Sequence, residues 1–118
     1  MEVVEKKIEN NILIAKFNSV ATIDIDMAKK MVEERLAFQE GNVYPTLVYL
    51  NGVKFASSEA RSFMKDKGLK GLSAGAFIIS NPVEKVIMNF LILISPPEIP
   101  TRMFTNESEA IKWLEQYK

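Results

Sequence analysis

The sequence of 118 residues contains no cysteine and no histidine. Without cysteine there is no disulfide, thiolate nucleophile or iron–sulfur cluster, and without histidine there is no Ser-His-Asp triad and no imidazole ligand for zinc. A catalyst built from this chain would depend on Asp, Glu, Lys, Ser, Thr or Tyr. We therefore expect a protein that is not an enzyme, with no catalytic residues, no metal site and no cofactor.

The sequence also lacks an excess of charge of either sign, because 15 Lys and Arg balance 15 Asp and Glu. Nucleic-acid binding relies on cations that neutralise phosphates, so a nucleic-acid partner is not expected. Residues 1–7 lack the apolar run of a signal peptide, and no apolar run reaches the roughly 20 residues of a membrane span. These features predict a cytoplasmic protein with no transmembrane segment.

What is present fits a single domain over residues 1–118, since 47% of the residues are hydrophobic and no linker interrupts the chain. Short apolar stretches predict strands over 2–9, 12–17, 45–50, 74–80 and 100–105. Helix-capping residues between them start four helices, at Asp24, at Ser57 or Ser58, at Asn81 and at Asn106. The order β-β-α-β-α-β-α-β-α predicts an α/β fold with a mainly parallel sheet and an antiparallel N-terminal edge strand.

The third helix, 82–95, carries the strongest hydrophobic feature, the run VIMNFLILI over residues 86–94. Its inward stripe is predicted to be Val83, Val86, Ile87, Phe90, Leu91 and Ile94. That choice leaves an outer apolar face, which we interpret as a candidate self-association face of a homodimer, formed by Met88, Ile92 and Leu93. Two alternatives stay open: the helix is simply buried, or it lines a pocket for an apolar small molecule or lipid.

In a parallel sheet, ligands and partners meet the loops that follow the carboxyl ends of the strands. The candidate partner rim there consists of Asn51, Lys54, Arg61 and Asn81. Ser57 and Ser58 are candidates for phosphorylation or for an anion site, because free amides and the positive dipole end of a helix lie beside them. The alternative is that these side chains only cap the helix.

Asp24 and Asp26 are the only close acidic pair in this region. They could share a magnesium ion or serve a hydrolase or phosphotransferase that works without histidine. No phosphate-cradling glycine motif accompanies them, so helix capping explains both residues more simply.

The element order, the segment LNGVKFASS over 50–58 and the closing segment PTRMFTNESEAIKWL over 100–114 resemble the STAS-like, or anti-sigma-factor-antagonist-like, domains. More narrowly, the chain is similar to a group of small uncharacterised bacterial STAS-like proteins. The resemblance covers nearly the whole chain. It implies a single STAS-like domain that acts through contact with a protein partner.

In the antagonists of that family, a strand ends in a segment similar to L-x-x-V-x-F-x-D-S-S-G, and a partner kinase phosphorylates a serine at the start of the following helix. Leu50, Val53 and Phe55 match this segment, and Ser58 falls at its first serine. The chain departs from it at three places, where Ser57, Glu59 and Ala60 replace the Asp, the second serine and the Gly. The resemblance thus implies a regulatory module with a degenerate phospho-serine switch; the alternative is a carrier or sensor of an apolar or lipid-like ligand between helix 82–95 and the sheet.

Overall fold

The computed structural model describes residues 3–18, 22–89 and 98–118. Seven strands, four α-helices and one 3-10 helix are formed by these residues: β1 (Val4–Glu9), β2 (Ile12–Phe17), β3 (Thr22–Ile23), α1 (Ile25–Gln39), β4 (Tyr44–Tyr49), β5 (Phe55–Ala56), α2 (Ser58–Lys67), β6 (Leu72–Ile78), α3 (Pro82–Asn89), β7 (Thr101–Phe104), α4 (Glu107–Leu114) and η2 (Glu115–Tyr117).

Five of the strands form the main sheet, in the order β1-β2-β4-β6-β7. Strands β2, β4, β6 and β7 are parallel, and β1 pairs with β2 in the antiparallel sense at the edge. Asn10 and Asn11 form the hairpin turn with φ of 52° and 63°, the left-handed values that a type I′ turn requires. The predicted α/β fold class and the antiparallel edge strand are confirmed.

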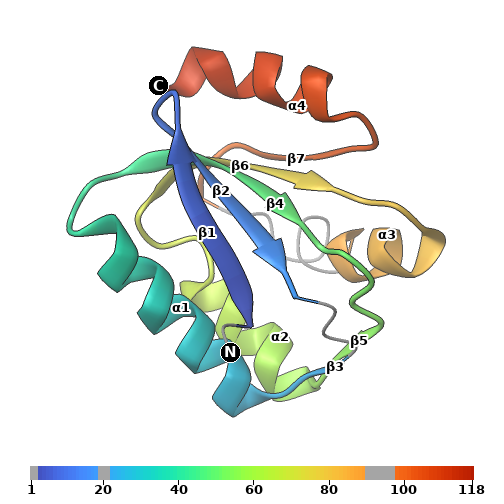
Figure 1. Ribbon diagram of the computed structural model, residues 1–118. Coiled ribbons are helices and arrows are strands. Elements are labelled where there is room, and N and C mark those ends of the chain that lie inside the picture. The colour runs from blue at the N-terminus through green and yellow to red at the C-terminus, as the bar shows by residue number, and fades with distance from the viewer. Residues whose placement is uncertain (1–2, 19–21, 90–97) are drawn as a thin grey trace.

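The strand order decides which face of the sheet each helix covers. Every step from β2 to β4, β6 and β7 moves in the same direction across the sheet, so right-handed crossovers place α1, α2 and α3 on one face. No strand follows α4, and this helix packs on the opposite face (Figure 1). The domain therefore has three layers, with a single short helix forming one of them.

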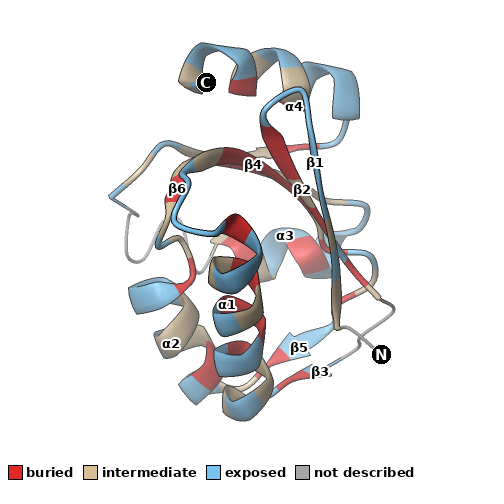
Figure 2. Ribbon diagram, turned by 60° about the vertical axis from the view of Figure 1, so that its left-hand side comes forward, coloured by how far each residue is buried: buried red, intermediate tan, exposed pale blue. Residues whose placement is uncertain are grey.

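Alternation along the strands sorts the apolar side chains between the two faces. In β2, Ile12 and Ile14 face α4, whereas Ala15 and Phe17 face the other helices. The neighbouring strand repeats the pattern, since Leu47 faces α4 and Val48 faces α1 and α2. Buried residues accordingly follow the strands and the inner side of α1 (Figure 2).

The predicted caps at Asp24, Ser57 and Asn106 are confirmed. Their side-chain oxygens accept hydrogen bonds from the backbone N–H groups three residues later, at 2.8 Å, 3.1 Å and 3.1 Å. The side chain of Asn81 accepts from the Glu84 N–H at 2.9 Å in the same way. Local sequence signals thus place the start of each helix correctly.

The predicted orientation of α3 is wrong at Val83, Val86 and Met88, whereas Ile87 packs against the core as predicted. Three further residues of the predicted inward stripe lie outside the described residues, namely Phe90, Leu91 and Ile94. Met88, expected on an outer face, is only 2% exposed and packs in the core, whereas Val86, expected inside, is 68% exposed. The reason is Glu84, a fully buried residue one turn before Met88, whose hydrogen bonds fix that side of the helix inward. Met88 therefore drops out of the candidate self-association face, while Ile92 and Leu93 lie outside the described residues.

Candidate functional site

The loops after β2, β4 and β6 form one edge of the molecule, which we call the carboxyl rim. An unpredicted pair of short strands, β3 and β5, joins two of these loops as a parallel ladder. The Ser57 N–H extends this ladder by donating to the Ile23 carbonyl at 3.0 Å. The start of α2 is therefore held against the loop that follows β2.

Ser57 and Ser58 differ in what their side chains do. The hydroxyl oxygen of half-buried Ser57 accepts from the Ala60 N–H, so this side chain is engaged as the helix cap. Ser58 is the first residue of α2, and it is exposed, like Glu59 beside it. Of the two serines, Ser58 is the one accessible to a kinase or a partner.

Glu84 connects the other two loops of the carboxyl rim. One carboxylate oxygen accepts from the Gly52 N–H at 2.7 Å, and the other accepts from the N–H and the hydroxyl of Ser80 at 2.8 Å and 3.0 Å. The loop after β4 and the loop after β6 are thereby joined through one fully buried side chain. Sequence reasoning identified only the helix cap at Asn81 in this region and missed the role of Glu84.

The remaining rim candidates are only partly brought together. Asn51 donates to the Phe17 carbonyl at 2.6 Å, so its side chain braces β2 against the loop after β4. Asn81 caps α3, and Lys54 is exposed. Arg61 is half-buried and lines a cavity behind the rim. Asn51 and Asn81 therefore have structural tasks, whereas Lys54 and Arg61 differ in how far they are exposed.

The acidic pair near the start of α1 behaves as capping residues do. Asp24 accepts from the Met27 N–H, and Asp26 is an exposed residue of the first turn. Within the described part of the chain, no three acidic side chains gather in a way that could hold a metal ion.

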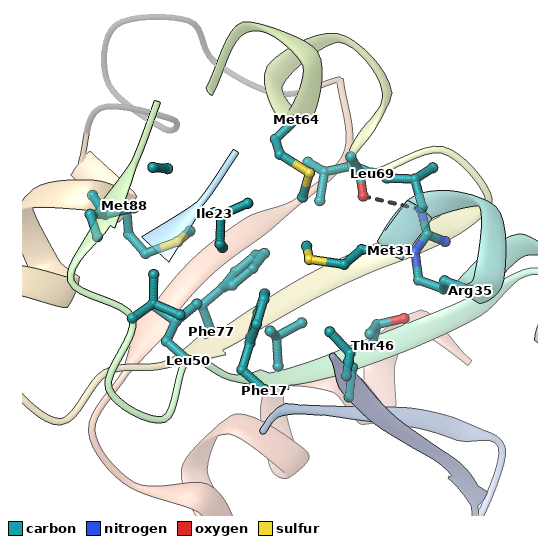
Figure 3. Close-up of a pocket in the computed structure, with 18 of the residues that line it drawn as sticks. Phe17, Ile23, Met31, Arg35, Thr46, Leu50, Met64, Leu69, Phe77 and Met88 are labelled. Carbon is teal, nitrogen blue, oxygen red and sulfur yellow. Dashed lines mark hydrogen bonds between the residues drawn. The ribbon is translucent and has the colours of Figure 1, made fainter. Parts of the chain in front are cut away.

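A cavity of about 140 Å³ lies between the sheet and helices α1, α2 and α3, and we call it the α1–α2 cavity. Its walls are mainly apolar and come from both layers, including Phe17, Met31, Val48, Met64, Phe77 and Met88. In the view of Figure 3, Met88 and Arg35 lie at opposite ends of the cavity, with Met31 and the two phenylalanines between them.

The end of the cavity at Arg35 is built by the last turns of α1. Arg35 is 8% exposed and donates to the side-chain oxygen of Gln39 and, at 3.1 Å, to the Gly68 carbonyl. Gln39 in turn donates to the carbonyls of Asn42 and Gly71 at 2.9 Å and 2.8 Å. This network ties α1 to the segment between α2 and β6, at the amino ends of the parallel strands.

Sequence reasoning missed Arg35 and Gln39, although a signal was available. The buried positions of α1 are Ala28, Met31, Val32, Arg35 and Gln39, which follow helical spacing. A cation and an amide on that stripe mark polar groups directed into an apolar layer.

The chain is similar to known proteins in sequence and in structure. The sequence matches the model of a domain of unknown function, DUF7793, over residues 6–118. The chain belongs to the DUF7793 family. No curated protein matches the sequence of this DUF7793 chain.

Among solved structures, the DUF7793 chain is similar to an uncharacterized protein of the DUF3478 family with a SpoIIAA-like fold from Shewanella loihica PV-4. The TM-score is 0.67 and the identity 16%, over 94% of this chain and 91% of that chain. The fold is thus SpoIIAA-like, which confirms the STAS-like resemblance seen in the sequence. A protein of unknown function from Arthrobacter sp. FB24 has 22% identity over 94% of this chain and 98% of that chain, with a TM-score of 0.36.

None of the helices that the described residues of the DUF7793 chain form has the length and apolar character needed to cross a bilayer. The family and the fold are established, and the carboxyl rim and the α1–α2 cavity are the candidate sites.

Proposed function

We propose that this DUF7793 chain is a non-enzymatic binding module that takes a small apolar ligand into the α1–α2 cavity. The observation that carries the proposal is the cavity itself, about 140 Å³ in volume and lined mainly by apolar side chains. Native cores leave few voids larger than a water molecule, because unfilled space forfeits dispersion contacts. A void of this size in a domain of 118 residues is better explained as a site than as a packing defect.

The size and the lining limit what the cavity can accept. An apolar cavity of about 150 Å³ stays dry and binds molecules such as benzene. The α1–α2 cavity is similar in volume, so its ligand is a ring or chain of about six to eight carbon atoms. Met31, Met64 and Met88 allow the wall to adapt, since methionine is unbranched and rotates about three side-chain bonds.

A substitution that fills the cavity tests this function. Val48→Phe adds a ring at the centre of the wall, and we expect it to abolish saturable binding of 1-octanol measured by calorimetry. The matched control is Ile14→Phe, on the neighbouring strand but facing α4, which should leave binding unchanged. Absence of saturable binding in the wild type, or binding that survives Val48→Phe, would contradict the proposal.

A second candidate function is regulatory docking of a protein partner at the carboxyl rim, controlled by phosphorylation of Ser58. It is favoured by the exposure of Ser58 at the first position of α2, with Lys54 exposed before it and Arg61 one turn later. A phosphate there would be stabilised by the helix dipole and by these cations, against repulsion from Glu59.

Phosphopeptide mapping of the protein isolated from its own cells tests the second candidate. The expected result is modification of Ser58 and not of Ser57, whose hydroxyl is engaged in the cap. A peptide that stays unmodified under every growth condition, together with a Ser58→Asp variant whose complexes are unchanged, would end this candidate.

A further inference from the structure

The described residues that line the α1–α2 cavity carry charge of one sign only. Its described lining residues include four cations, Lys6, Arg35, Arg61 and Lys65, and no Asp or Glu. Over the whole chain the two signs are equal, 15 against 15, so the bias is local to the cavity. Lys6 has a nearby carboxylate, that of Glu34 at 3.9 Å.

Arg35 is a buried cation of this wall, and no acid among the described residues balances its charge. The groups that accept its hydrogen bonds, the Gln39 amide oxygen and the Gly68 carbonyl, are both neutral. Among the described residues, no carboxylate oxygen lies within 4.0 Å of its guanidinium. Burial lowers the pKa of Arg35 to about 10, as expected for a desolvated cation without an anionic neighbour.

A buried cation without an opposite charge is costly to the fold, and an anion placed beside it offsets that cost. The guanidinium is a planar fork of N–H donors that matches the two oxygens of a carboxylate. From Arg35 the apolar wall continues past Met31 and the two phenylalanines toward Met88 (Figure 3). The cavity is thus polar and cationic at one end and apolar along the rest.

We infer, resting on the proposed binding function, that the ligand is an amphipathic carboxylate whose head pairs with Arg35 and whose apolar chain of about six to eight carbons extends toward Met88. The head then lies at the amino ends of the strands, on the opposite side of the domain from the carboxyl rim. Helix α1 runs back from the rim, so its last turns, with Arg35, lie beside the segment that leads into β6.

Octanoate and 1-octanol are the probes that test the inference, because they share the chain and differ in the charged head. We expect octanoate to bind at least tenfold more tightly than 1-octanol. In Arg35→Met the affinity for octanoate should fall at least tenfold, while that for 1-octanol changes less than twofold. Arg35→Lys, which keeps the charge, and Lys29→Met, on the exposed side of α1, should both retain the preference for octanoate.

A second measurement holds even if Arg35→Met does not fold. The pKa of carboxyl-¹³C-labelled octanoate, followed by NMR in the wild-type complex, should be lower than that of the free acid, because the guanidinium favours the charged form. Equal affinities for octanoate and 1-octanol, or an unshifted ligand pKa, would overturn the inference and leave the binding function intact. Failure of both probes to bind would overturn the binding function, and the inference with it.

Discussion

The two faces of the sheet differ in how completely they are filled. On the α4 face, Leu47, Ala74, Ala76, Ala110 and Leu114 are all fully buried. An aromatic cluster closes that layer, with ring centroids of Phe104 and Trp113 5.6 Å apart and those of Trp113 and Tyr117 4.9 Å apart. The opposite face carries three helices, yet it contains the α1–α2 cavity and the buried Arg35.

The difference follows from the side chains that each face presents. Alanines on β6 and α4 let the single helix approach the sheet closely, so that one short helix suffices to cover it. The other layer is built around methionines and phenylalanines, larger side chains that leave an irregular space between them. The α4 face is thus the more completely filled of the two, and the α1–α2 face contains the cavity that we propose as a binding site.

The largest effect on stability is expected from side-chain truncations, which should cost more on the α4 face than on the α1–α2 face. Leu114→Ala removes a fully buried side chain from the filled face and should lower the free energy of unfolding by about 2–5 kcal/mol. Met31→Ala removes a side chain that already borders empty space, so its cost should be smaller. Urea denaturation of both variants measures the difference, and equal costs would mean that the two faces are packed alike.

Substitution of Glu84 tests the hydrogen bonds that join the loops after β4 and β6 on the less-filled face. Glu84→Ala leaves the N–H groups of Gly52 and Ser80 without their acceptor, and each loss costs roughly 1–3 kcal/mol. Because Ser80 is exposed, water replaces part of its loss, and we expect a total of about 2–4 kcal/mol in the same denaturation experiment. The control, Glu33→Ala on the exposed side of α1, should change stability by about 0.5 kcal/mol or less. Similar values for both variants would show that the hydrogen bonds of Glu84 do not stabilise the domain.

Substitutions that add volume should cost more stability on the α4 face than on the α1–α2 face. Ala76→Val inserts two carbons into the filled layer under α4 and should cost about 1–3 kcal/mol. Val48→Phe, which grows into the cavity, should cost less than about 1 kcal/mol despite its larger added volume. Thermal unfolding of the two variants checks the order of the effects; a larger loss for Val48→Phe would show that the cavity is not free space.

The smallest effect concerns pH. Because burial lowers the pKa of Arg35 to about 10, the native state releases this proton before the unfolded chain does, and stability rises with pH above about 10. Tyr49 acts in the opposite sense, since burial and the nearby Glu107 carboxylate raise its pKa.

Comparing the wild type with Arg35→Met cancels the Tyr49 contribution. Between pH 9 and pH 11, the wild type should gain stability relative to this variant by about 1 kcal/mol, as judged by urea denaturation. A difference that does not change with pH would mean that the guanidinium is well solvated.

The fold could be predicted from the sequence because its signals are local. Asn10-Asn11 determines the hairpin, Asp24 and Asn106 cap their helices, and apolar runs mark the parallel strands. The ladder between β3 and β5 could not be predicted, since two-residue strands have no periodicity and depend on a contact between distant loops.

The candidate site was predicted only in part, for a similar reason. Ser58 could be located from a capping pattern, and the hypothesis of an apolar pocket near the third helix anticipated a cavity that Ile87 and Met88 do line. Arg35 and Glu84 were missed because their roles depend on partners 33 and 32 residues away in the chain. Counting apolar residues on α3 likewise could not show that a buried carboxylate orients the helix.

The most direct test of the account follows methionine methyl groups by NMR while 1-octanol is added to the wild type. Met31, Met64 and Met88 line the cavity, whereas Met27 and Met103 pack against the same core without appearing among its described lining residues. We predict saturable shifts for the first three signals and little change for the other two. No saturable shift, or equal shifts in all five, would contradict the claim that the α1–α2 face holds a ligand site.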